Sequence, residues 1–271
     1  MTNDLISIAG WDPSAGAGVL LDLRVFERLG RRGFGVLAAV TAQSAERVGG
    51  VFPVPARAVA AQFESLAAGI DVGGIKIGML ATAANLKVAA RILESRPGLP
   101  RVIDPVLRSS SGALLLEKKA WPRFLETVEG KASLITPNLA EASALTGRPV
   151  RNVAEMRTAA EKIHLRSAIP CLVKGGHLEG GQAVDILFDG SSVSAFAHPK
   201  LARNVHGTGC YLSSAILCYL AEGRPLKEAC GLGIFRVGRA IRAAMPGGKG
   251  VWVFDFSRER GRVSLPPRGS D

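Results

Sequence analysis

Apolar and polar positions in the first 45 residues predict a strand, a helix and a second strand. Leu5 to Ala9 is a short apolar run that ends at a glycine, which is typical of a buried strand. Gly18 to Leu29 carries apolar residues at helical spacing, and Gly35 to Thr41 is again a short apolar run. This order predicts a βαβ unit, in which the two strands lie parallel.

The same alternation continues through the middle of the chain. Each further strand-like run is followed by a plausible helix or loop, and the runs are Ile75 to Leu80, Arg101 to Val106, Ser133 to Thr136 and Cys171 to Lys174. Repeated βα units build a mostly parallel sheet that is covered on both faces. We therefore predict an α/β fold with a mostly parallel central sheet flanked by helices on both faces.

Beyond residue 180 the pattern indicates antiparallel strands and then two helices. Ala183 to Phe188 and Ser192 to Ala197 flank a turn-forming Asp-Gly-Ser sequence, which predicts an antiparallel edge hairpin. Tyr211 to Ala221 and Pro225 to Met245 have helical character. The glycine-rich segment Gly247 to Gly250 is predicted to be a flexible loop.

Length and composition predict a single domain. A chain of 271 residues that is 47% hydrophobic can bury one large core. The last stretch is rich in Arg, Pro, Ser and Gly, and it has too little apolar surface to offset the entropy of ordering. We expect one domain over residues 1–256 and a flexible tail over residues 257–271.

Charge and cysteine content narrow the class of protein. The net charge of +11 arises from Lys and Arg that are scattered along the chain, so it favours anionic small molecules over nucleic acid. No apolar run reaches the roughly 18 to 20 residues that span a bilayer, and the N-terminus does not resemble a signal peptide. The four cysteines lack metal-ligand spacing. We expect a cytoplasmic protein with neither a nucleic acid nor a membrane as partner.

The clearest chemical signal is the segment Asn204-Val-His-Gly-Thr-Gly-Cys210, which directly precedes a predicted helix. Backbone N–H groups of Gly207, Thr208, Gly209 and Cys210 would converge at the helix N-terminus. Such a turn holds an anion and suits the charge on a transferring phosphoryl group. The segment therefore predicts an anion hole.

Cys210 is a candidate base in the first turn of that helix. The helix field is expected to lower the pKa of its thiol, and a thiolate could then take the proton of a substrate hydroxyl. An inert, buried structural cysteine is the alternative. We interpret His206 as a residue that shapes the loop by hydrogen bonding, not as a catalytic group.

A second glycine-rich segment, Ala9-Gly-Trp-Asp-Pro-Ser-Ala-Gly-Ala-Gly18, follows the first predicted strand. It lacks the Gly-Lys-Ser/Thr of a Walker A loop, and its glycine spacing does not match GxGxxG. Its small residues would let the backbone approach a ligand closely. Asp22, one helical turn further on, could accept a hydrogen bond from the amino group of a heterocycle, or it could be an exposed helix carboxylate.

Polar residues also follow three of the later predicted strands, at the edge where open α/β sheets bind ligands. Asp104 and Glu141 are candidates for holding Mg²⁺, directly or through waters. Lys174 precedes two glycines and is suited to an ATP phosphate. Each of the three is also an ordinary residue of a loop, a turn or a helix cap.

Taken in chain order, these motifs resemble the hydroxymethylpyrimidine/phosphomethylpyrimidine kinase family of the ribokinase-like superfamily. The Gly-Thr-Gly-Cys ending is the most specific, because most ribokinase-like sugar kinases have Asp where Cys210 stands. The resemblance runs from about Ile6 to Arg239, and the segments that carry it are Ala9 to Gly18, Thr41-Ala-Gln43, Lys76-Ile-Gly-Met79, Asp104-Pro-Val106, Thr136-Pro-Asn-Leu-Ala-Glu141, Val173-Lys-Gly-Gly-His177 and His206-Gly-Thr-Gly-Cys210.

The resemblance implies a ribokinase-like fold and an ATP- and Mg²⁺-dependent kinase of thiamine diphosphate biosynthesis. Its acceptor would be 4-amino-5-hydroxymethyl-2-methylpyrimidine, the monophosphate of this alcohol, or both, and a homodimer is the family's habit. The resemblance implies the following sites: Gly10, Asp22, Gln43, Met79 and Val106 for the substrate; Gly207, Thr208, Gly209 and Cys210 for catalysis; Lys174 and Thr208 for ATP; and Asp104 and Glu141 for Mg²⁺.

Three other functions are compatible with parts of the pattern. A pyridoxal or pyridoxine kinase also phosphorylates a hydroxymethyl group on a flat heterocycle, and Gln43 and Cys210 do not exclude it. A non-catalytic pyrimidine-binding sensor is suggested by departures from the family pattern at Trp11, at Leu20-Leu21 and between Gly247 and Phe256. A dinucleotide-dependent oxidoreductase fits an α/β sheet, but the missing GxGxxG counts against it.

Overall fold

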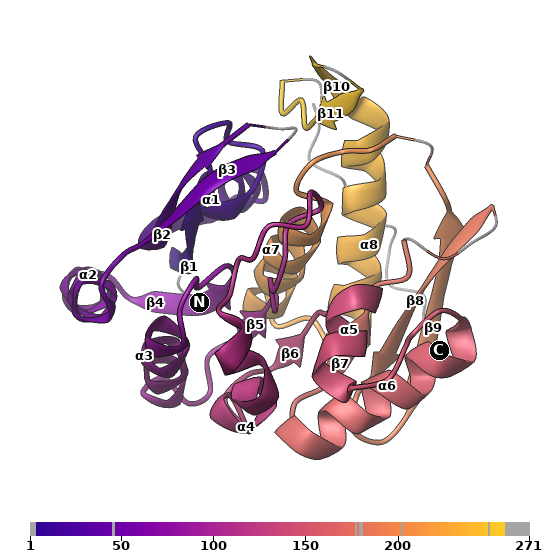
Figure 1. Cartoon of the computed structure of the whole chain (residues 1–271), viewed down its shortest axis with the longest axis horizontal. Helices are drawn as coiled ribbons and strands as arrows, with labels where there is room; N and C mark the ends of the chain where they lie inside the picture. Colours follow the sequence, from indigo (N-terminus) through magenta and orange to yellow (C-terminus); the bar gives the residue numbers. More distant parts are fainter. Residues whose placement is uncertain are drawn as a thin grey trace.

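The computed structural model describes residues 4–44, 47–176, 178, 181–201, 203–248 and 250–257. A nine-stranded sheet forms its centre, with the strand order β3-β2-β1-β4-β5-β6-β7-β8-β9 (Figure 1). The strands are β1 (Asp4–Trp11), β2 (Arg32–Gln43), β3 (Val48–Pro53), β4 (Val72–Ile77), β5 (Arg101–Ile103), β6 (Leu134–Ile135), β7 (Cys171–Val173), β8 (Gln182–Phe188), β9 (Val193–Pro199), β10 (Met245–Gly248) and β11 (Val251–Val253).

The strands from β2 across to β7 run parallel, and antiparallel strands close both edges of the sheet. β1 pairs in parallel with β2 and β4, and parallel pairing continues through β5, β6 and β7. The hairpin of β8 and β9 is antiparallel at one edge, and β3 is antiparallel at the other. The predicted α/β sheet with an antiparallel edge hairpin is therefore confirmed. β3 was not predicted, because two adjacent glycines interrupt its apolar pattern.

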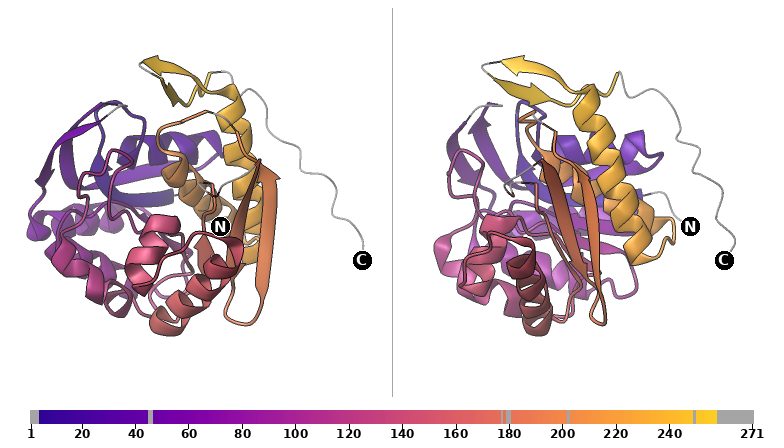
Figure 2. Two further views of the ribbon diagram at one scale, coloured as in Figure 1. Left: turned by 45° about the vertical axis from the view of Figure 1, so that its right-hand side comes forward. Right: turned by 90° about the vertical axis from the view of Figure 1, so that its right-hand side faces the viewer.

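Helices cover both faces of the sheet (Figure 2). Alternate residues of β1 face opposite sides of the sheet. Leu5 packs in the hydrophobic core under one layer of helices, Ile6 packs in the core under the other layer, and both side chains are 0% exposed. Among the described residues, no helix combines the length and apolarity needed to cross a bilayer. One layer holds α1 (Gly18–Arg28), α7 (Thr208–Ala221) and α8 (Leu226–Ala243), and the other holds α2 (Ala56–Gly69), α3 (Ala83–Glu94), η1 (Lys118–Arg123), α4 (Phe124–Thr127), α5 (Leu139–Thr146) and α6 (Val153–Ser167).

The segment predicted to be a flexible loop near Gly247 forms part of a hairpin. β10 and β11 pair antiparallel, with Met245 opposite Val253. Trp252 ties this hairpin to the preceding loop: its N–H donates to Asn204 O, and its carbonyl accepts from the His206 N–H, each at 2.9 Å. The prediction was wrong for Gly247 and Gly248, which belong to β10, because this tertiary pairing overrides the glycine-rich composition.

The predicted tail lies almost entirely outside the described residues, which end at Ser257. His177 and Lys249 are also outside them. The division into a domain of residues 1–256 and a flexible tail stays a prediction.

Candidate active site

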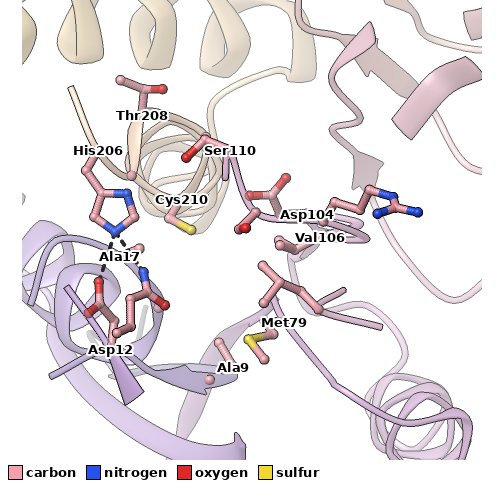
Figure 3. A pocket seen from close by; sticks show the side chains of 18 of the residues that line it. Ala9, Asp12, Ala17, Met79, Asp104, Val106, Ser110, His206, Thr208 and Cys210 are labelled. Carbon is pink, nitrogen blue, oxygen red and sulfur yellow. Dashed lines mark hydrogen bonds and ion pairs between the residues drawn. The ribbon is translucent and has the colours of Figure 1, made fainter. Parts of the chain in front are cut away.

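A pocket lies at the carboxyl ends of the parallel strands, facing the start of α7 (Figure 3). The segments that follow β1, β4, β5 and β7 all contribute to its wall, which is the edge where open α/β sheets bind ligands. Except for Asp22, every residue that the sequence assigned to a site lies in this wall: Gly10, Gln43, Met79, Asp104, Val106, Glu141, Lys174, Gly207, Thr208, Gly209 and Cys210.

The N-terminus of α7 lies at the segment where the sequence predicts an anion hole. Gly207 is the N-cap residue, with φ 83° and ψ 13°. A Cβ atom at this position would lie 1.9 Å from Gly16 O, so the tight turn requires glycine. The first N–H groups of the helix have no acceptor within the helix, and they can therefore bind an anion in the pocket.

Lys174 and Asp104 form an ion pair at the floor of the pocket. The Lys174 ammonium donates to Asp104 Oδ1 at 2.7 Å, and the side chains are 13% and 3% exposed. Burial acts to lower the pKa of Lys174, but the carboxylates of Asp104 and Glu141 outweigh it and raise that pKa. A Cβ on Gly209 would lie 3.1 Å from Lys174 Nζ, which places the helix start directly beside the cation.

Glu141 is held by the first turn of α5. Its carboxylate accepts from the Asn138 N–H at 2.8 Å, and its own N–H donates to Asn138 Oδ1 at 2.9 Å, a capping box. Burial raises the pKa of Glu141 to about 7, against the opposing effect of Lys174. A cation nearby would therefore stabilise its ionised form.

Asp104 and Glu141 together fit a magnesium ion. Both carboxylates line the pocket beside Lys174, and carboxylate oxygen is a donor that Mg²⁺ prefers. Within the described part of the chain, no group of three or more His, Cys, Asp or Glu side chains could hold a metal ion. A site with two carboxylates is typical of Mg²⁺ that completes its shell with substrate phosphates and water.

Cys210 lies in the first turn of α7, at the pocket wall (Figure 3). Burial raises the pKa of its thiol to about 11, and the Lys76 ammonium acts in the opposite direction. The prediction of a lowered thiol pKa was wrong, because burial has a larger effect on that pKa than Lys76 has. At neutral pH Cys210 is a thiol.

Asp22 does not line the pocket, and its carboxylate is fully committed elsewhere. The side chain is 0% exposed and accepts from Lys76 Nζ at 2.7 Å on both oxygens. It also accepts from Ser7 Oγ at 2.6 Å and Ser214 Oγ at 2.8 Å. With its acceptor positions occupied, Asp22 has no free oxygen for a ligand. A lysine inside an apolar strand requires a buried partner, and this signal at Lys76 was missed.

His206 and Asp12 are further pocket residues, and the sequence did not assign them a ligand role. His206 Nε2 lies 3.0 Å from Asp12 Oδ2 and 3.0 Å from Gln43 Nε2. The interpretation of His206 as a hydrogen bonder fits these contacts, but its ring belongs to the pocket wall as well as to the loop. Trp11 also lies in the wall.

A second pocket adjoins the first at Lys174, Thr208 and Gly209, which line both. Its far wall comes from Asp185 and His198 of the β8–β9 hairpin and from an apolar side of α8. Two hollows thus meet at a lysine and a helix N-terminus. This arrangement lets two ligands meet end to end at a site that stabilises negative charge. The residues of α8 that line this pocket are Ile234, Val237, Gly238 and Ile241.

Proteins of similar sequence match most of the chain. The chain is 38% identical to the hydroxymethylpyrimidine/phosphomethylpyrimidine kinase of Aquifex aeolicus over 93% of this chain and 99% of that protein. It is 41% identical to the thiamine biosynthesis bifunctional protein ThiED of Geobacter sulfurreducens over 91% of this chain, and it spans 50% of that longer protein.

Solved structures give the same fold. The pyridoxal kinase of Staphylococcus aureus in complex with AMP-PCP has a TM-score of 0.85 at 29% identity, covering 94% of each chain. The phosphomethylpyrimidine kinase of Clostridium difficile has a TM-score of 0.76 at 34% identity, covering 88% of this chain and 99% of that one. Residues 12–255 match the model of the phosphomethylpyrimidine kinase family. The chain therefore belongs to the phosphomethylpyrimidine kinase family, with its ribokinase-like fold.

Proposed function

We propose that this protein transfers the γ-phosphoryl group of ATP to 4-amino-5-hydroxymethyl-2-methylpyrimidine, to its monophosphate, or to both in turn. The observation that carries the proposal is the junction of the two pockets at Lys174 and the start of α7. An acceptor alcohol in the first pocket and a nucleotide in the second would bring the reacting oxygen and the phosphoryl group together there.

The first pocket suits a small, flat heterocycle. Met79 and Val106 supply apolar contacts, and Gly10 leaves room, because a Cβ there would lie 2.7 Å from Met79 Sδ. Gln43 supplies an amide at the pocket wall for the polar edge of the ring. Pockets of this kind combine apolar walls with a few placed polar groups.

The second pocket suits the nucleotide. Its apolar α8 wall would receive the base, and the phosphates would point to Lys174, Thr208 and the N–H groups of α7. Mg²⁺ would be held by Asp104 and Glu141 together with the phosphates, and it would neutralise part of their charge. Arrangements of this kind catalyse phosphoryl transfer mainly by positioning and electrostatic stabilisation.

The chain's own groups would act on both ends of the transfer. The acceptor oxygen forms a bond to the γ-phosphorus while the bond from that phosphorus to the bridging oxygen of ADP breaks. The N–H groups of Gly207 to Gly209 and the Lys174 ammonium stabilise the negative charge on the phosphoryl oxygens. In its thiolate form, which becomes more abundant as pH rises, Cys210 would accept the proton that leaves the hydroxyl group, as a general base.

Pyridoxal kinase activity is the second candidate function. Its support is structural, since the S. aureus pyridoxal kinase has a TM-score of 0.85 to this chain and its complexes include one with pyridoxal. The pyrimidine remains the first candidate because the family match and the named sequence relatives favour it. A non-catalytic sensor is less supported, because the candidate catalytic residues all lie together at the pocket.

We also propose a homodimer in the cytoplasm. The outer surface of β2 and β3 exposes Val40 at 42% and Phe52 at 61%, which is unusual for side chains of this kind on a sheet edge. Covering this face with a second copy would bury them. The four free cysteines and the use of ATP suit a reducing compartment.

The experiment is an acceptor panel with ATP and Mg²⁺. Phosphorus NMR of the products would identify which of the pyrimidine alcohol, its monophosphate and pyridoxal becomes phosphorylated. We expect pyrimidine phosphates as products, with the highest kcat/KM on a pyrimidine. Faster turnover of pyridoxal would move the assignment to a vitamin B6 kinase, and binding of the pyrimidine without any ADP release would support the sensor.

A further inference from the structure

Asp12, Gln43 and His206 form one polar cluster in the acceptor pocket, and the proposed chemistry leaves the role of His206 open. The three side chains come from the ends of β1 and β2 and from the loop before α7. His206 Nε2 lies 3.0 Å from Asp12 Oδ2, the contact drawn as a dashed line in Figure 3. The same nitrogen lies 3.0 Å from Gln43 Nε2.

Asp12 determines which atom of this contact carries the hydrogen. Burial acts to raise the pKa of Asp12, but that pKa is lowered overall, and Ser14 contributes to the lowering independently of His206, because its N–H and its hydroxyl both donate to Asp12 Oδ1. An ionised carboxylate is only an acceptor. His206 Nε2 must therefore carry a hydrogen, whether the ring is neutral or charged.

This hydrogen fixes the direction of the Gln43 amide. The structure has Gln43 Nε2 on the side of His206 and Gln43 Oε1 3.3 Å from Thr41 Oγ1. A nitrogen that carries a hydrogen cannot accept one from the amide NH₂, however, and the nitrogen and oxygen ends of an amide have the same shape. The hydrogen-bond pattern therefore requires the reversed amide, with its carbonyl oxygen facing His206 and its NH₂ facing Thr41. Thr41 donates its own hydrogen to Trp11 O at 2.8 Å, and its oxygen is thus free to accept from the amide. The donors and acceptors at both ends of the amide therefore require the same orientation, with the carbonyl toward His206 and the NH₂ toward Thr41.

The His206 ring is itself held in place. Its backbone N–H donates to Trp252 O at 2.9 Å. A Cβ on Gly16 would lie 2.5 Å from His206 Cδ2, so the ring packs closely on that backbone. Asp12 is anchored in turn by Ser14, whose N–H and hydroxyl donate to Oδ1 at 2.9 and 2.7 Å. The cluster is a fixed wall and not a set of independently mobile side chains.

We propose that His206, held by Asp12, is a positioning residue that turns the carbonyl of Gln43 into the protein and one amide N–H toward the pocket. The acceptor pocket would then select heteroaromatic alcohols whose ring offers a hydrogen-bond acceptor, a ring nitrogen, at that point. The inference rests on the proposed function for the class of substrate. The direction of the amide rests on which atoms of Asp12, His206 and Thr41 can donate and accept, and not on the substrate.

Two analogues of the pyrimidine alcohol test the selection, each with one ring nitrogen replaced by C–H. In the unmodified protein we expect the KM of one of the two to be about tenfold higher than that of the parent alcohol, because a donor in the pocket loses its acceptor. In His206→Leu the amide is free to turn, and we expect this discrimination to fall to about threefold or less. kcat on the parent alcohol should change less than KM.

Two further variants sharpen the test. In Asp12→Asn the new amide NH₂ can donate to His206 Nε2, so this nitrogen no longer has to carry a hydrogen. The Gln43 amide could then turn its NH₂ toward His206, and the difference in KM between the parent alcohol and its analogues should again fall. His198→Leu removes the matching His–Asp contact, His198 Nε2 to Asp185 Oδ2 at 3.1 Å, from the second pocket. The discrimination should persist in this control, whatever its effect on the KM for ATP. An equal loss of affinity for all three alcohols in His206→Leu would reduce His206 to a merely structural residue and overturn the proposal.

Failure of the proposed function would look different. The unmodified protein would then fail to phosphorylate the parent alcohol at all, and the substrate part of the proposal would fall with the function. Nitrogen-15 NMR of the histidines tests the amide direction without any substrate or variant. A hydrogen on His206 Nε2 is the result expected, and a bare, accepting Nε2 would overturn the inference.

Discussion

Two lysine–aspartate pairs lie on this sheet, and they differ in what surrounds them. In each pair the ammonium nitrogen lies 2.7 Å from a carboxylate oxygen. The Lys76–Asp22 pair is 0% exposed on both sides, and two serine hydroxyls complete the acceptor positions of Asp22. The Lys174–Asp104 pair opens on both pockets through its lysine, and the nearest hydroxyls lie at 3.4 and 3.5 Å from Asp104.

The difference teaches how to separate a structural pair from a functional one. A buried pair whose hydrogen bonds are all made inside the protein has nothing left to offer a ligand. A pair with spare acceptors and an exposed ammonium can exchange its contacts for a phosphate or a metal ion. Chain position does not distinguish the two, since both lysines and Asp104 lie at or near the ends of parallel strands.

The largest expected effect comes from breaking the fully buried Lys76–Asp22 pair. Lys76→Met leaves the Asp22 carboxylate buried without a cation, and we expect the free energy of unfolding to fall by about 3–5 kcal/mol. Denaturant titration measures this loss. Adding Asp22→Asn removes the unpaired charge and should recover part of the stability. An unchanged free energy of unfolding in Lys76→Met would show that water reaches the Lys76–Asp22 pair.

Breaking the Lys174–Asp104 pair at the pocket should affect turnover more than stability. Lys174→Ala removes a cation from the transferring phosphoryl group, and we expect kcat to fall by about 10²–10³-fold. The loss of unfolding free energy should be smaller than for Lys76→Met, because water in the pocket can solvate Asp104. Steady-state ADP release and denaturant titration on the same preparation give both numbers. A stable variant with normal kcat would contradict the assignment.

Two glycines at the start of α7 extend the comparison at smaller magnitude. Gly207→Ala forces a left-handed φ of 83° and a contact of 1.9 Å with Gly16 O, so we expect stability to fall by about 1–3 kcal/mol. Gly209→Ala displaces the Lys174 ammonium, which lies 3.1 Å from the added Cβ. We expect kcat/KM for ATP to fall by about 10- to 100-fold with little change in stability. A loss of stability in Gly209→Ala and a loss of kcat/KM in Gly207→Ala would contradict these assignments.

A further expected effect is a pH dependence from Cys210. Burial raises the pKa of its thiol to about 11, so the base form is scarce at neutral pH and increases as pH rises. We expect kcat to rise between pH 7 and pH 9, by up to about tenfold per pH unit. Cys210→Ala should show a flat profile over the same range. A flat profile in the unmodified protein would leave Cys210 as a packing residue.

Most of the fold could be predicted because each strand and helix has a local signal. The apolar run Leu5 to Ala9 lies inside β1, and the helix expected over Gly18 to Leu29 matches α1 within a residue. β3 and the β10–β11 hairpin could not be predicted, since their glycines hide the alternation and their pairing depends on distant segments. Local pattern does not reveal such contacts.

The pocket residues were found through their motifs, but their partners were not. The sequence placed Asp104, Glu141 and Lys174 at strand ends, where the sheet brings them together. Asp22 was assigned to a ligand because its partner, Lys76, lies 54 positions away and its burial is a tertiary property. The pKa of Cys210 was misjudged for the same reason, because desolvation by the surrounding core cannot be read from the first turn of a helix.

The most direct test of the phosphotransferase assignment is ADP release with ATP, Mg²⁺ and the hydroxymethylpyrimidine, for the unmodified protein and for Cys210→Ala. We predict turnover that requires the pyrimidine and that falls by about 10²–10⁴-fold in the variant, with both proteins equally folded by circular dichroism. Folded, unmodified protein that releases no ADP with the pyrimidine or its monophosphate would contradict the account.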